Sequence, residues 1–207
     1  MSANGTSAAT AEVVRHLTDP AALGLVGVVE VFEDLQTVLR CCERLVSDLA
    51  ERAEPDEIAV EAIWTTALLS YARCFGAGGT GGVLTEDDVA STHNSKDEVL
   101  RWHRLLLNLR DHYADPAVNP RERFAVGVTQ DADGAASGVA ITSAKQPLVD
   151  DLTVRQTGAI AYALSGIVNQ RIETTQQQVF ADVRSRSTDE LDALETLEVA
   201  TDSDGTG

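Results

Sequence analysis

Hydrophobic residues recur at intervals of three and four over several long stretches of the chain, which is the pattern of α-helices that bury one side. The first stretch begins at Asp19-Pro20, a capping residue followed by the residue favoured at the first helical position, and continues to about Arg52. Its apolar stripe is wider than a coiled-coil seam, so the sequence predicts a helix of a bundle. The seam consists of Leu25, Val28, Phe32, Leu35, Leu39, Cys42, Val46 and Leu49, and Val31, Val38 and Leu45 widen it.

The same period predicts three further long helices. We expect them at 55–75, 95–113 and 153–184. The segments 95–98 and 153–156 have capping-box sequences and are expected to begin the last two of these helices. Thr85, followed by three acidic residues, has the pattern of an additional helix start.

Between 122 and 144 the helical period gives way to an alternation of two, which is typical of β-strands. Phe124, Val126 and Val128 alternate with small or polar residues, and Val139 and Ile141 do the same after a turn. The sequence therefore predicts a β-hairpin inserted before the last long helix. Because an isolated hairpin is marginally stable in water, we expect it to lie on the helices or to pair with another chain.

These elements predict a mostly α-helical bundle with one inserted hairpin. We place a flexible N-terminus at 1–18, the helical domain at 19–186 and an acidic C-terminal tail at 187–207. The last twenty residues contain seven acidic residues and no basic ones, which favours a solvated tail. A short helix there is the alternative, because leucines recur every three residues at Leu191, Leu194 and Leu197.

The chain carries a formal net charge of −17, with 33 acidic residues against 16 basic ones. A field of that sign repels phosphates and anionic lipid head groups, so nucleic-acid binding and membrane-surface binding are both disfavoured. The three cysteines form no disulfide framework, and the sequence shows neither a secretory segment nor an apolar run long enough to span a bilayer. We therefore expect a cytoplasmic protein with reduced thiols.

The sequence contains no convincing pattern for a cofactor or a metal. The segment 76–81 has the GxGxxG spacing of dinucleotide-binding loops, but it follows a predicted helix where such loops follow a strand. The four histidines are not spaced as metal ligands with one another or with the cysteines. Carboxylate pairs in so acidic a chain identify no site, so we predict no cofactor and no metal.

Two short motifs give the chain a resemblance to a known superfamily. Tyr71-Ala72-Arg73-Cys74-Phe75 ends the second long predicted helix, and Leu109-Arg110-Asp111 closes a later one before a proline-containing loop that reaches Asn119. With the hairpin and long helix that follow, the segment 59–184 resembles bacterial HEPN-like proteins. The resemblance implies a helical bundle that often forms a homodimer through its motif-bearing helix, here the one at 96–113.

The resemblance also implies one candidate catalytic residue and one that is missing. Many active HEPN proteins cut RNA without a metal, using an arginine that is followed four to six residues later by a histidine. Arg110 matches that arginine, but Pro116 stands in the histidine's place, and proline can neither donate nor accept a side-chain proton. His112 is a poor substitute, because two residues along a helix are separated by about 200°.

Three functional hypotheses follow. The first is a non-catalytic HEPN-like binding or regulatory protein, in a toxin–antitoxin or defence setting that only the resemblance implies. Its candidate site is the cluster Arg73, Arg110, Asp111 and Asn119. The alternative is a structural role, in which Arg110 and Asp111 form a pair and Arg73 meets Asp111 or a helix C-terminus through charge-assisted hydrogen bonds. The second is a degenerate metal-independent ribonuclease using Arg110 and His112. The third is a generic helical protein-interaction module that recruits a basic partner through its first helix and acidic tail.

Overall fold

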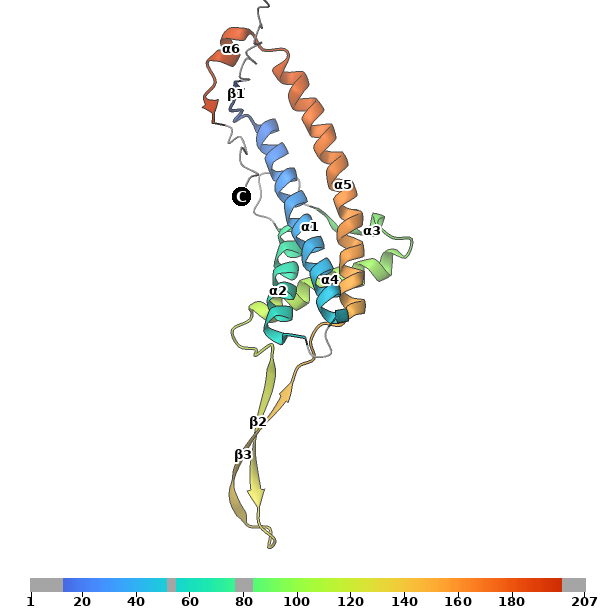
Figure 1. Ribbon diagram of the computed structural model, residues 1–207, viewed down its shortest axis with the longest axis vertical. Coiled ribbons are helices and arrows are strands. Elements are labelled where there is room, and N and C mark those ends of the chain that lie inside the picture. Colours follow the sequence, from blue (N-terminus) through green and yellow to red (C-terminus); the bar gives the residue numbers. More distant parts are fainter. Residues whose placement is uncertain (1–12, 52–54, 77–83, 199–207) are drawn as a thin grey trace, which may run out of the picture.

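Two long helices packed side by side form the spine of the fold (Figure 1). They are α1 (Pro20–Glu51) and α5 (Asp151–Val183). This arrangement comes from a computed structural model that describes residues 13–51, 55–76 and 84–198. The glycine-rich segment at 76–81 lies, apart from its first residue, outside the described residues.

Three further helices complete the bundle. The helix α2 (Glu57–Arg73) packs on α1, and α4 (Lys96–Ala114) packs on α2. A short helix, α3 (Glu86–Ser91), contacts both α4 and α5. The prediction of a mostly α-helical bundle is confirmed.

The core is centred on the side of α1 that faces α2 and α5. Leu35, Val38 and Leu45 are fully buried, whereas Leu39 and Val46 are only partly buried. The most buried line of α1 therefore combines part of the predicted seam with the residues predicted to widen it, namely Val28, Leu35 and Cys42 with Val31, Val38 and Leu45. The physical reason is that α1 packs against two neighbours at once, so the residues between its two contact lines are the most enclosed.

The capping boxes predicted at 95–98 and 153–156 do not form in the part of the chain that the structure describes, whereas the predicted start at Thr85 does. Thr85 and Asp88 form a reciprocal capping box at α3. At α5 the cap is Asp150, whose Oδ1 accepts a 2.7 Å hydrogen bond from the Thr153 backbone, so the helix begins before the predicted box. The side chain of Ser95 makes no capping hydrogen bond within the described structure.

A β-hairpin, which we call the arm, extends away from the helices at one end of the bundle (Figure 1). It consists of β2 (Glu122–Gln130) and the antiparallel β3 (Ala136–Lys145), which agrees with the predicted hairpin at 122–144. In the turn, Oδ1 of Asp131 accepts hydrogen bonds from the backbone N–H groups of Asp133 and Ala135. Gly134 closes the turn with a φ of +82°, a conformation that other residues adopt only at an energetic cost.

The two ends of the described chain meet at the other end of the bundle. A two-residue strand, β1 (Val14–Arg15), pairs antiparallel with β4 (Thr196–Leu197). A short helix, α6 (Thr188–Asp192), precedes β4 and begins with its own capping box. These pairings satisfy backbone groups of both segments, which neither would achieve alone.

The described parts of both ends therefore correct the sequence prediction. Neither the segment 13–18 nor the segment 187–198 is a free extension, although we expected a flexible N-terminus and a solvated acidic tail. Arg15 donates a 3.1 Å hydrogen bond to the carbonyl oxygen of Leu194, and Arg186 donates one of 3.0 Å to Asp19, the residue before α1. A short helix is present, but of the three leucines that suggested it only Leu191 lies in α6, and Leu197 lies in β4.

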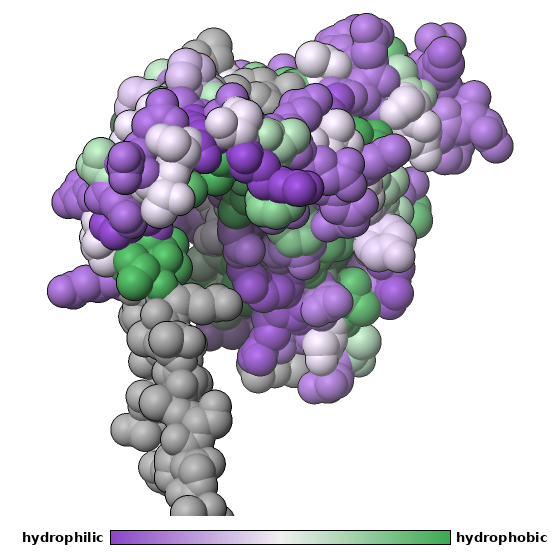
Figure 2. All heavy atoms as spheres, turned by 90° about the horizontal axis from the view of Figure 1, so that it is seen from above, coloured by the Kyte–Doolittle hydropathy of each residue, from purple (hydrophilic) through white to green (hydrophobic). Residues whose placement is uncertain are grey.

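The surface opposite the arm is largely hydrophilic. Seen from that end, polar and charged residues cover most of the view, and hydrophobic residues form small, separate areas (Figure 2). None of the described helices combines the length and the apolar character that crossing a bilayer requires.

Candidate functional site

Arg110 and Asp111, the centre of the predicted cluster, form a local pair near the end of α4. Nε of Arg110 lies 2.8 Å from Oδ1 of Asp111. The geometry is not that of a hydrogen bond, because the buried Nε–H has no hydrogen-bond partner within the described structure. The contact is therefore an ion pair between sequence neighbours, a type that contributes at most about 1 kcal/mol to stability.

Arg73 pairs with α1 instead of α4. Its Nε lies 3.2 Å from Oδ2 of Asp34, so the expected contact with Asp111 is replaced by a tie between α2 and α1. Partial burial raises the pKa of the Asp34 carboxyl, and the nearby guanidinium of Arg73 acts in the opposite direction.

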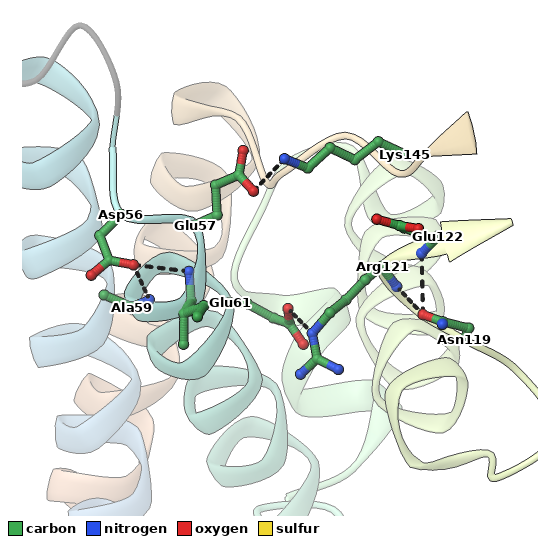
Figure 3. A network of polar contacts seen from close by, with 9 residues as sticks. Asp56, Glu57, Ala59, Glu61, Asn119, Arg121, Glu122 and Lys145 are labelled. Atoms are coloured by element: carbon green, nitrogen blue, oxygen red, sulfur yellow. Dashed lines mark hydrogen bonds and ion pairs between the residues drawn. The ribbon is translucent and has the colours of Figure 1, made fainter. Parts of the chain in front are cut away.

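Asn119 has a structural role at the start of the arm. Its Oδ1 accepts hydrogen bonds of 2.9 Å from the Arg121 backbone and 3.1 Å from the Glu122 backbone (Figure 3). These bonds fix the turn by which the chain enters β2. No residue of α2 or α4 takes part in them.

The predicted cluster is thus divided among three places. Tyr71 of α2 contacts His103 of α4, which sets the two helices side by side at the level of Arg73. Arg110 lies seven residues further along α4, a displacement of about 10 Å along the helix axis. Arg73 and Arg110 therefore pair with different carboxylates, Asp34 of α1 and Asp111 of α4.

The predicted catalytic pair, Arg110 and His112, is also separated. The helix α4 continues through Ala114, so the two side chains leave it about 200° apart. His112 is exposed, and its ring centroid lies 6.2 Å from that of Tyr113. Pro116 follows in the turn after the helix and brings no proton-transfer group to Arg110.

A buried aromatic cluster that neither sequence motif indicates links α2 to α4. The Tyr71 hydroxyl and Nδ1 of His103 are 2.9 Å apart in a hydrogen bond, and both side chains are almost completely buried. The Phe75 ring packs 4.4 Å from the His103 ring, centroid to centroid. Burial lowers the pKa of His103, so its ring is neutral near pH 7, and burial raises the pKa of Tyr71.

Replacing Tyr71 with phenylalanine should destabilise the fold by about 1 to 2 kcal/mol, because it leaves a buried ring nitrogen of His103 without its partner. Urea unfolding followed by circular dichroism measures this change. Tyr162→Phe is the matched control, since that tyrosine is 74% exposed and should change stability by less than about 0.5 kcal/mol. Equal effects of the two substitutions would show that the buried hydrogen bond contributes nothing.

Cys42 and Cys74 are not candidate nucleophiles. Burial raises the pKa of Cys42 and of Cys74 to about 12, so both thiols stay protonated near neutral pH. Within residues 13–51, 55–76 and 84–198, no group of three or more histidine, cysteine or acidic side chains is placed to hold a metal ion.

The recesses on the helical surface do not gather the predicted residues. One of about 310 Å³ lies between α4 and α5, beside Trp102 and Ile160, and its size is at the lower limit for a small-molecule site. A larger one of about 730 Å³ runs along the first half of α1 and includes Arg73. None of Arg110, Asp111 and Asn119 lines either recess.

Ion pairs anchor the root of the arm to the first turns of α2 (Figure 3). Nε of Arg121 lies 2.8 Å from Oε2 of Glu61, and Nζ of Lys145 bonds to Glu57. The Gln146 backbone also donates a 2.8 Å hydrogen bond to the carbonyl oxygen of Arg121, which closes the hairpin at its root. The root is therefore held from both strands, although the arm beyond it projects freely from the helices (Figure 1).

One face of the arm is apolar and exposed. The cross-strand pairs Val126 with Ile141 and Val128 with Val139 share this face, together with Phe124. Between 56% and 74% of each of these five residues is accessible to solvent. We call them the arm face. The opposite face consists of small and polar residues, apart from Arg123 at the root.

The arm face is apolar and lies within uncharged stretches of its two strands. Its strands are uncharged from Phe124 to Gln130 and from Gly134 to Ala144, in a chain with 24% charged residues. The alternation of apolar residues predicted the hairpin but could not show that its apolar side is exposed to solvent. The exposure follows from the position of the arm, which none of the described helices covers (Figure 1).

Comparison with protein-family models gave no match, and comparisons with curated proteins and with solved structures gave none either.

Proposed function

We propose that this chain is a non-catalytic, HEPN-like binding or regulatory module, in which the helices form a scaffold and the arm contacts a protein. The observation that carries the proposal is the exposed arm face. Its HEPN-like character rests only on the two helix-end motifs, and a toxin–antitoxin or defence setting would follow from that kinship.

An exposed apolar hairpin is a costly feature unless it has a partner. Fully burying a valine, isoleucine or phenylalanine side chain contributes about 1.5 to 3 kcal/mol, and the arm leaves most of this unused in the isolated chain. A two-stranded hairpin has too little internal packing to be stable alone. Contact with a protein surface would supply both the burial and the rigidity.

The charge distribution favours a protein partner over a nucleic acid. A net charge of −17 opposes phosphate binding, and the arm carries no cluster of basic residues beyond its root. The basic side chains Arg121 and Lys145 at the root already pair with acidic residues of α2.

The separation of Arg110 from His112 supports a non-catalytic role. General acid–base cleavage needs the proton donor within reach of the reacting group, and the continuous helix places the imidazole on another side from the guanidinium. No observation favours the ribonuclease alternative.

A photoreactive amino acid at position 126, in cells that naturally produce the protein, should form covalent adducts with protein. The same residue at position 125 should form several-fold fewer, because Val126 and Ala125 are neighbours in β2 that point to opposite faces. Gel mobility and mass spectrometry measure the adducts and identify the partner. Equal yields at both positions, or none at either, would contradict the proposed role of the arm face.

A further inference from the structure

We propose that the partner of the arm is a second copy of this chain, and that two copies exchange arms so that each arm face packs on the outer side of the other copy's α2. This inference rests on the proposed function, in which the arm makes the protein contact. It adds the identity of the occupant and the surface that receives the arm.

The outer side of α2 carries an uncharged stripe. Ile58, Ala62, Thr66 and Leu69 are all exposed and follow one another at helical spacing, so they share one side of the helix. Ile58 is 78% exposed and Leu69 is 46% exposed. The hydroxyl of Thr66 donates to the carbonyl oxygen of Ala62 within the helix, which leaves its methyl group for an apolar contact. We call these four residues the α2 stripe.

The arm and the α2 stripe start at the same end of the bundle. Lys145 and Arg121 tie the arm root to the first turns of α2 (Figure 3). A strand of nine residues spans about 30 Å, and the 17 residues of α2 span about 25 Å. If a twofold axis brings the two roots together, each arm can run along the other copy's α2 from its first turn to its last.

The charges at the far ends are complementary in this arrangement. Asp131 and Asp133 lie in the turn at the arm tip. Arg73 ends α2, directly after the α2 stripe, and 73% of its side chain is exposed. The acidic tip of one arm would therefore lie near the guanidinium of the second copy, while the rest of the contact is uncharged on both sides.

The net charge also favours this surface over the outward side of α4 for self-association. Two copies with a charge of −17 each repel one another, so their contact is most favourable where both surfaces are neutral. The outward side of α4, by contrast, carries Arg101, Arg104 and Asp111, all exposed. The arm face and the α2 stripe avoid both the charge and the desolvation of such side chains.

The size of the contact argues for two reciprocal copies. One face of the arm measures about 30 Å by 10 Å, so a single arm on a single surface would bury about 600 Å² in total. Specific protein interfaces bury at least about 1,200 Å². A symmetric exchange makes the same contact twice and reaches that range, which a one-sided contact with an unrelated surface does not.

Sedimentation velocity of the full-length chain, at about 1 to 100 µM, tests the inference. We expect a reversible dimer that tightens as salt is raised, because screening weakens the repulsion between the copies. Val126→Glu on the arm face and Leu69→Glu on the α2 stripe should each weaken dimerisation by about tenfold or more.

Two substitutions serve as matched controls. Ala125→Glu adds the same charge to the opposite arm face, and Val26→Glu adds it to an exposed apolar position of α1. Both should leave the dimer unchanged. If Val126→Glu disrupts the arm itself, Leu69→Glu still tests the contact, because it acts on α2 alone.

A charge exchange tests the proposed direction of the arm. Arg73→Glu should weaken the dimer and also removes the ion pair with Asp34 inside each copy. Asp133→Arg in the same chain should restore the dimer but not that ion pair, because each tip meets the changed helix end of the other copy. Failure of this rescue would contradict the arrangement.

A monomer at every concentration would overturn the inference. So would a dimer that Val126→Glu disrupts and Leu69→Glu does not, because the arms would then have another receiving surface. If the chain is monomeric but position 126 forms adducts with a different protein, the proposed function stands and the second copy is excluded. If it is monomeric and position 126 forms no preferential adducts, both proposals fail.

Discussion

Replacing Leu164 with alanine should lower the free energy of unfolding by about 2 to 5 kcal/mol. Leu164 lies in the middle of α5 and is fully buried in the core that α5 forms with α1. The substitution loses the transfer free energy of the buried carbons and leaves a cavity, because two packed helices relax only partly around it. Urea unfolding monitored by circular dichroism measures the change.

Leu152→Ala is the control for this experiment. Leu152 lies in the same helix and is 64% exposed, so its truncation should change stability by less than about 0.5 kcal/mol. If the slope of the unfolding free energy against urea concentration is the same in both variants, their difference lies in stability and not in the compactness of the unfolded chain. Similar losses for both variants would contradict the packing of α5 on α1.

Gly158→Leu and Gly166→Leu should change the free energy of unfolding in opposite directions, although both glycines lie in α5. A Cβ at position 158 would lie 3.4 Å from Cβ of Cys42 on α1, so a larger side chain there would push the two helices apart. We expect a loss of about 1 to 3 kcal/mol from this overpacking. At position 166 no atom lies within 4 Å of an added Cβ, and leucine should stabilise by about 0.5 to 1 kcal/mol through its higher helix propensity.

The two variants can be compared by thermal and urea unfolding under identical conditions. Cys42→Ala combined with Gly158→Leu should recover part of the loss, because it removes the sulfur that the new side chain meets. Stabilisation by both leucines would mean that α1 and α5 are not in close contact at Gly158.

The long helices and the hairpin were predictable because their hydrophobic periods differ so clearly. Phe124, Val126 and Val128 show the alternation of two, and the helix of Leu35 shows intervals of three and four. The caps were less predictable, because Asp150 lies three residues before the predicted capping box at 153–156 and is itself the cap of α5. The pairing of β1 with β4 was not predictable, because two residues on each side carry no period.

The partner of Arg73 in the candidate cluster was not predictable for a related reason. A motif fixes which residues share a helix end but not which neighbouring helix each side chain meets. Arg73 pairs with Asp34 of α1, a contact that the spacing of either motif could not indicate. Likewise, the buried hydrogen bond between Tyr71 and His103 depends on how α2 packs on α4. Exposure of the arm face depends on what the helices leave uncovered.

The pairing of β1 with β4 has a consequence for the order of folding. Arg15 and Thr196 are 181 positions apart in sequence, and closing a loop of that length in an unfolded chain costs about 5 kcal/mol of chain entropy. Two short strands cannot offset such a cost. Their contact can form only after α1 and α5 have brought the termini together, so it would be the last part of the structure to assemble and the first to open.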